Sequence, residues 1–167
     1  LTSGDYNAAF GHNALTLSTD ASRNTAIGVD AMAATTTGTH NTAVGQAAMY
    51  LNTTASANTA SGYAALYYNT TGKDNIATGY YALLNNTTGN WNTAIGAYAL
   101  QSNTTGQYNL YFGYRSGFNN TTGNNNSFLG YQSGKNNTEG ADNFFMGYES
   151  GLDNTTGNQN IYLGSET

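Results

Sequence analysis

One glycine returns every 17 residues along this chain, with no insertion or deletion over ten copies. An asparagine stands four residues before each of these glycines, and a threonine recurs with the same period. A fixed period predicts that every copy stacks on the preceding one, as in a solenoid or a fibre, because a loose surface repeat would drift in length. The glycines are Gly11, Gly28, Gly45, Gly62, Gly79, Gly96, Gly113, Gly130, Gly147 and Gly164.

The composition limits the classes of function. Charged residues make up 8% of the 167 residues and the formal net charge is −5, whereas nucleic-acid binding requires a basic surface. We therefore expect no nucleic-acid partner. No apolar run is long enough to span a bilayer, so we expect no membrane insertion of this segment. The absence of cysteine excludes disulfides and thiolate metal sites. The chain begins and ends within a repeat, which suggests a fragment of a longer fibre protein.

The repeat itself predicts an all-β coil. We number it from its asparagine as position one, so that Asn24 to Gly28 are positions one to five and Asn69 to Gly72 are positions 12 to 15. The glycine at position five suits a tight corner after a short strand, and the Asn-Thr-Thr-Gly run has the chemistry of a turn. We therefore expect two short extended pieces and two corners in each coil. Frequent glycine and the lack of a 3.6-residue stripe argue against helices.

Positions three and four of the repeat are both apolar in most copies, as in Ala26-Ile27 and Phe145-Met146. Adjacent residues of a strand face opposite sides, so one side chain fills the coil and the other points outwards. A strand that is apolar on both faces is typical of burial on both faces. We therefore expect a second copy of the chain to cover the outer face, and we predict a homotrimer.

Two positions exchange volume along the chain. While position three is alanine, position nine is leucine or methionine, as in Ala94 and Leu100. From Tyr111 onwards position three is aromatic and position nine is glycine, as at Gly117. Close packing requires such compensation only of residues that touch, so the two positions are predicted to meet in the core. The single repeat domain of residues 1–167 thus has two sections, residues 1–106 and 107–167.

The asparagine ladder has a structural explanation. Identical amides stacked at strand spacing can hydrogen-bond to one another along the stack. Ten coils at about 4.8 Å each would form a rod segment about 48 Å long. The residues that we assign to this structural ladder are Asn24, Gly28, Asn41, Gly45, Asn92, Gly96, Asn126 and Gly130.

The segments NTAIG at residues 24–28 and 92–96 and NTAVG at 41–45 resemble the N-S-V-A-I-G-x-x-S head repeat of YadA-type trimeric autotransporter adhesins. Ser116, Ser133 and Ser150 match its final serine. The repeat sequence also resembles repeats of phage tail fibres and surface proteins that end in an endosialidase-type intramolecular chaperone. The resemblance implies a left-handed parallel β-roll in which three chains pack about a threefold axis. The family's coil is shorter, and the extra length here lies around Asn-Thr-Thr-Gly.

Tyrosines form a partial ladder at position six, just after the corner glycine. Tyrosine combines an apolar ring with a hydroxyl and suits contacts with sugars or with proteins. These residues are therefore candidates either for ligand binding or for the seam between protomers. They are Tyr63, Tyr80, Tyr114, Tyr131 and Tyr148.

Signals for catalysis or for a cofactor are poor. His12 and His40 occupy different repeat positions, and no nucleophile–base–acid set or phosphate loop is apparent, so we expect no enzyme and no cofactor. Asp142, Glu149 and Asp153 share one coil and either form a solvated acidic face or hold a hard cation.

The leading hypothesis is a rod segment of a phage tail fibre or a bacterial surface adhesin, located outside the cell, that contacts a host glycan or protein. An ice- or carbohydrate-binding solenoid is the alternative, but adjacent threonines in a turn, such as Thr87-Thr88, do not form the flat array that ice binding uses. A polysaccharide-cleaving solenoid would need clustered carboxylates that this segment lacks.

Overall fold

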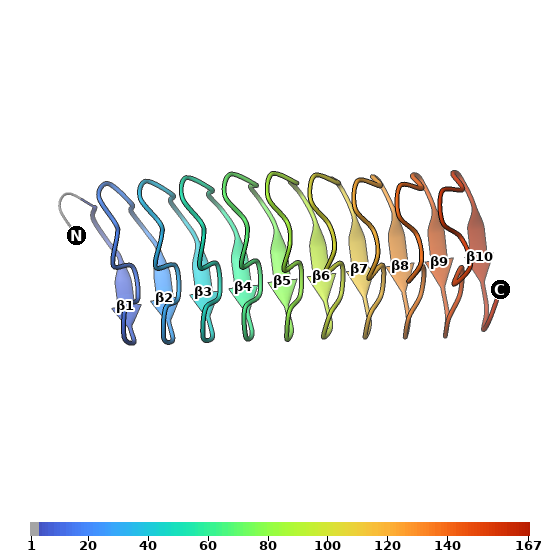
Figure 1. Cartoon of the computed structure of the whole chain (residues 1–167), viewed down its shortest axis with the longest axis horizontal. Helices are drawn as coiled ribbons and strands as arrows, with labels where there is room; N and C mark the ends of the chain where they lie inside the picture. The colour runs from blue at the N-terminus through green and yellow to red at the C-terminus, as the bar shows by residue number, and fades with distance from the viewer. Residues whose placement is uncertain (1–3) are drawn as a thin grey trace.

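Ten strands of three residues each form one parallel sheet in the computed structural model, which describes residues 4–167. The strands follow one another in the order β1 to β10, and the chain winds through about nine turns of a β-solenoid (Figure 1). The described residues contain no helix. The strands are β1 (Ala8–Phe10), β2 (Thr25–Ile27), β3 (Thr42–Val44), β4 (Thr59–Ser61), β5 (Ile76–Thr78), β6 (Thr93–Ile95), β7 (Leu110–Phe112), β8 (Ser127–Leu129), β9 (Phe144–Met146) and β10 (Ile161–Leu163). The predicted all-β parallel solenoid is confirmed.

Every strand pairs with the next in perfect repeat register. Ala26 lies opposite Ala43, and Ala94 lies opposite Tyr111, so identical repeat positions stack along the whole sheet. The corner glycines at position five explain why the register cannot slip. Their φ angles lie between 130° and 140°, and a Cβ on Gly28 would stand 2.6 Å from the carbonyl carbon of Gly45. Both the conformation and the close approach of successive coils therefore require glycine.

The prediction of a second extended piece in each coil is wrong. After the corner glycine the chain forms turns, and no second strand is present among residues 4–167. Positions seven, nine and 17 have left-handed backbone even where the residue is not glycine, as at Met32, Leu100 and Trp91. Residues with positive φ interrupt an extended segment. Hydrogen bonds between coils, such as Met32 N–H to the Ala48 carbonyl at 3.0 Å, hold this backbone in place.

The predicted contact between positions three and nine is confirmed. Both positions are fully buried, as Ala94 and Leu100 in one section and Tyr111 in the other. A Cβ on Gly117 would collide with the ring of Tyr111, so the large ring and the missing side chain share one space. Ser116 at position eight donates its hydroxyl to the carbonyl of Phe128 at 3.0 Å.

The asparagines at position one form the predicted ladder of amides. Asn75 donates from Nδ2 to Oδ1 of Asn58 at 3.1 Å, and its own Oδ1 accepts the backbone N–H of Asn92 at 3.0 Å. Nδ2 of Asn75 also donates to the carbonyl of Gly89 at 2.9 Å. The side chain is fully buried, and every polar group on it is paired.

A second amide ladder runs through position 12, where the sequence indicated only a turn. Asn86 and Asn103 are fully buried, and Asn103 donates from Nδ2 to Oδ1 of Asn86 at 2.7 Å. The Asn-Thr-Thr runs at Asn52 and Asn103 have the sequence of N-glycosylation sites, but these amides lie inside the coil. A sugar on either nitrogen would have to displace buried hydrogen bonds.

Candidate functional site

The outer face of the sheet is an extended surface with many exposed apolar residues. Strand residues alternate, so the middle residue of each strand points into the coil, and the first and third point outwards. We call the outward residues of β1 to β10 the strand face. No part of residues 4–167 covers it, since Phe112 is 53% exposed and Leu110 is 42% exposed. The exposed large apolar residues of this face are Phe10, Ile27, Val44, Ile76, Leu110, Phe112, Phe144, Met146, Ile161 and Leu163.

The apolar character of the strand face is uneven. The middle strands present small polar groups there, for example Thr59 and Ser61 on β4 and Thr78 on β5. From β7 onwards the outward residues are large and apolar, apart from Ser127. The strand face therefore becomes more apolar at the same coil where the core changes its filling.

In the structure, the rings of the tyrosine ladder predicted at position six stack on one another. The rings of Tyr63 and Tyr80 stack at a centroid distance of 5.2 Å. Tyr114 and Tyr131 stack at 5.4 Å, and Tyr131 and Tyr148 stack at 5.2 Å. Because stacked rings cover one another's faces, they offer mainly ring edges and hydroxyls to a ligand.

Tyr98 bridges the gap that the sequence left in this ladder. Position six of the sixth coil is Ala97, which interrupts the series between Tyr80 and Tyr114. The ring of Tyr98, at position seven, lies 5.4 Å from that of Tyr80 and 5.9 Å from that of Tyr114. We call the resulting series the tyrosine row: Tyr63, Tyr80, Tyr98, Tyr114, Tyr131 and Tyr148. The repeat pattern alone did not place Tyr98 in the ladder, because Tyr98 occupies another repeat position.

The hydroxyls of the tyrosine row interact with their neighbours. Hydrogen bonding to Tyr81 raises the pKa of the Tyr63 phenol above its ordinary value of 10. The carboxylate of Glu149 raises the pKa of Tyr148, because a second negative charge beside it is unfavourable. At neutral pH these phenols are therefore uncharged and able to donate hydrogen bonds.

A separate aromatic pair lies at position 17. The rings of Trp91 and Tyr108 stack at 4.9 Å with planes 3° apart, and both side chains are exposed. They follow the Asn-Thr-Thr-Gly turn and precede the strand, whereas the tyrosine row follows the strand.

The acidic residues Asp142, Glu149 and Asp153 are not gathered into a metal site. Within residues 4–167, no group of three or more histidine or carboxylate side chains is placed to hold a metal ion. Asp142 accepts a hydrogen bond from Nδ2 of Asn125 at 3.0 Å. Glu149 and Asp153 instead line a cavity of about 500 Å³ at the C-terminal end of the stack.

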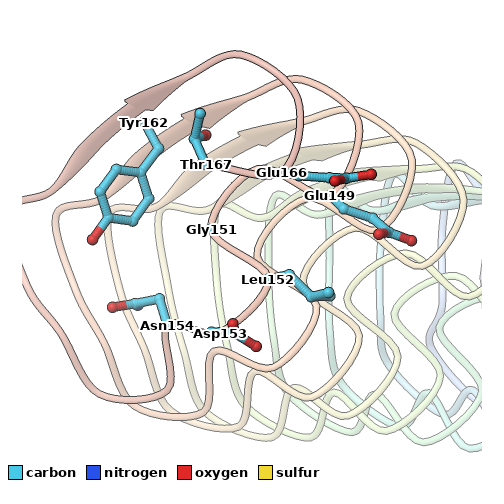
Figure 2. Close-up of a pocket in the computed structure, with 8 residues that line it drawn as sticks. All are labelled: Glu149, Gly151, Leu152, Asp153, Asn154, Tyr162, Glu166 and Thr167. Carbon is cyan, nitrogen blue, oxygen red and sulfur yellow. The ribbon is translucent and has the colours of Figure 1, made fainter.

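Figure 2 shows this cavity, with Tyr162 on one side and the stacked Glu149 and Glu166 on the other. One face of the Tyr162 ring packs on Phe145 at 4.8 Å, so this cavity is the end surface of the aromatic core. Its walls come from the last coils of the stack.

None of the described residues forms a helix long and apolar enough to cross a membrane. Comparison with known proteins found no matching family model, no similar curated protein and no similar solved structure.

Proposed function

We propose that this chain is a structural and adhesive rod segment of an extracellular attachment fibre, on a phage tail or a bacterial surface, and that three copies pack along their strand faces. The observation that carries the proposal is the uncovered strand face, which presents exposed large apolar residues on β1 to β3, β5, β7, β9 and β10. A large contiguous apolar surface on a soluble chain marks an interaction site. The resemblance to YadA-type adhesin heads and tail-fibre repeats supports the choice of three copies.

The strand face alone is too small to form a stable interface between copies of the chain. Strands of three residues are about 10 Å wide, and ten of them at about 4.8 Å cover roughly 480 Å² per chain. A stable interface buries about 800 Å² on each partner. The residues beside the strand face must therefore join the seam. Tyrosines of the tyrosine row stand one residue beyond the corner glycine, or two in the case of Tyr98, and we place their strand-side edges at the rim of the seam.

Assembly would give the rod both stiffness and valency. Parallel coils held by two amide ladders leave the chain no hinge, and the outer walls can change in sequence without disturbing the ladders. Three identical walls about one axis bind a surface with higher avidity than a single wall.

The alternative of an ice-binding solenoid has less support. Threonines at position 14, such as Thr54 and Thr71, are exposed along the stack. Their neighbours at position 13 are committed to the fold, since Thr53 donates its hydroxyl to the carbonyl of Thr70 at 3.1 Å. Only one threonine of each adjacent pair is therefore free to form a regular array.

Substitutions on the strand face test the proposal. We expect Phe112→Ser combined with Phe144→Ser to shift the chain from trimer towards monomer in sedimentation experiments, because both remove large exposed apolar groups. Because these residues point away from the core, the thermal unfolding of the monomer should hardly change. Thr59→Ala on the polar part of the same face is the matched control and should leave the trimer intact. A trimer that tolerates the double substitution would contradict the proposed seam.

A further inference from the structure

Arg115 is the one cation within the tyrosine row. It follows β7 at position seven of the repeat, between Tyr114 and Ser116. The centre of its guanidinium lies 5.3 Å from the ring centroid of Tyr114 and 5.5 Å from that of Tyr98. Phe118 completes the group at 5.3 Å. Three aromatic rings therefore surround a charge that is partly removed from water.

Among residues 4–167, the guanidinium of Arg115 has no hydrogen-bond acceptor. Its Nε is buried without a hydrogen-bond partner, and no carboxylate among residues 4–167 pairs with it. Aromatic rings attract a cation but accept no strong hydrogen bond. A guanidinium offers five N–H donors in a planar fork that matches a carboxylate, and the side chain of Arg115 is only half-buried. The donors other than Nε are therefore available to an external acceptor.

The tyrosine row changes its orientation at this point. Elsewhere its rings stack with planes 4° to 19° apart. The ring of Tyr98 is turned 65° from Tyr80 and 87° from Tyr114, and it faces the guanidinium. The next coil places Lys135 at the repeat position of Phe118, so two of the chain's four basic residues lie on neighbouring coils of this wall.

We propose that Arg115, with Tyr98, Tyr114 and Phe118, binds the carboxylate of an acidic sugar in a glycan that lies along the tyrosine row. Phenol hydroxyls and ring edges recur along the row at the coil spacing of about 4.8 Å, close to the length of one sugar unit. The net charge of −5 disfavours a densely charged polyanion, whereas one cation within an uncharged row fits a ligand with sparse carboxylates. This inference rests on the proposed adhesive function and names the ligand class for it.

The site is compatible with the proposed seam. Arg115 and Phe118 belong to positions seven and ten of the repeat. Both positions lie in the turns after the corner glycine, farther from the strand than position six. A partner copy on the strand face would meet the corner glycines and the near edge of the tyrosine row first. The guanidinium would remain on the outer wall of each protomer.

Calorimetric titration of the full chain tests the inference. The probes are a linear uronic-acid oligosaccharide and an oligosaccharide that ends in sialic acid, each compared with its methyl ester. We expect at least one acid to bind, and we expect esterification to weaken it about tenfold or more, because a charge-assisted hydrogen-bonded pair is lost. Arg115→Gln should weaken the acid by a similar factor, while Arg115→Lys should keep part of the affinity.

Arg23→Gln is the matched control, because Arg23 also lies over one tyrosine ring, Tyr6, at 5.9 Å, but far along the rod. It should leave the affinity unchanged, and unchanged thermal unfolding would show that Arg115→Gln folds. Failure of both acids to bind would overturn the inference, as would equal binding of acid and ester or an equal loss in Arg23→Gln. Equal binding of a glutamate-rich peptide would assign the site to protein carboxylates instead and would also overturn it.

Sedimentation of the same samples separates this inference from the proposed assembly. A trimer that binds neither acid would contradict only the glycan site. A monomer that binds an acid through Arg115 would contradict only the trimeric rod.

Discussion

The ring of Tyr111 occupies the space in which a Cβ of Gly117 would stand. The two residues lie six apart in the same coil, one at the centre of β7 and the other in the following turn. In the preceding coil the same space holds the side chain of Leu100 above Ala94. One backbone path therefore accepts two ways of filling its core, and the pair must change together.

Exchanging the pair tests this coupling directly. Gly117→Leu alone should destabilise the chain by about 3 kcal/mol, because the leucine collides with the ring. Tyr111→Ala alone should cost about 3–5 kcal/mol, because it leaves a cavity. The double variant should recover most of the loss, since it only moves the existing junction between the two fillings by one coil. Urea unfolding of all four proteins measures the coupling, and additive losses would contradict the shared space.

Tyr111→Phe should stabilise the chain at neutral pH. The hydroxyl of Tyr111 is buried and makes no hydrogen bond of good geometry, although the amide of Asn126 lies nearby. The residues stacked above it are Phe128 and Phe145. A buried unpaired hydroxyl costs about 1–3 kcal/mol, so its removal should raise the midpoint of thermal unfolding. Tyr162→Phe at the partly exposed end of the stack is the control and should change little. A lower midpoint for Tyr111→Phe would show that the hydroxyl has a partner.

The same phenol should make the fold sensitive to alkali. Burial raises the pKa of Tyr111 well above its ordinary value of 10, and the amide of Asn126 offsets only part of this effect. Above about pH 10 the unfolded chain loses this proton while the folded chain keeps it, so stability falls as pH rises. The advantage of Tyr111→Phe should therefore grow by up to about 1.4 kcal/mol per pH unit above 10. Urea unfolding between pH 8 and pH 11 measures it, and a constant difference would contradict the burial of the phenol.

Removing one amide from the middle of the ladder should be costly. Asn75→Ala leaves the backbone N–H of Asn92 and the carbonyl of Gly89 without their buried partners. We expect a loss of about 3 kcal/mol in the free energy of unfolding, because each unpaired buried group costs about 1–3 kcal/mol. Asn160→Ala at the end of the ladder, where the side chain is only part-buried, should cost about 1 kcal/mol. Equal effects at both positions would contradict a cooperative ladder.

The sequence predicts this fold well where one repeat position meets the same position in the next coil. The corner glycines and the stack of Asn24 on Asn41 follow from the period alone, because in-register stacking makes identical residues neighbours. The exchange of Tyr111 and Gly117 was also accessible, since compensating volumes identify a contact inside one coil.

Contacts between different repeat positions could not be predicted from the period of the sequence. Tyr98 joins the tyrosine row, and Arg115 enters its ring cage, only because the turn after each corner glycine has left-handed backbone at position seven. Nothing in the residue types at that position requires positive φ, so the sequence indicated an extended piece instead. The buried ladder through Asn86 was hidden for a related reason, because Asn-Thr-Thr-Gly also matches an exposed turn. The hand of winding stays a prediction from the resemblance.

The mass of the assembled chain in solution tests the central claim most directly. Light scattering coupled to size exclusion should give three times the chain mass of 17.5 kDa. The protein concentration must lie well above the dissociation constant of the trimer. Phe112→Ser with Phe144→Ser should lower that mass towards a single chain. A wild-type chain that stays a folded monomer of 17.5 kDa, with its strand face exposed to water, would contradict the proposal that copies of this chain pack along that face.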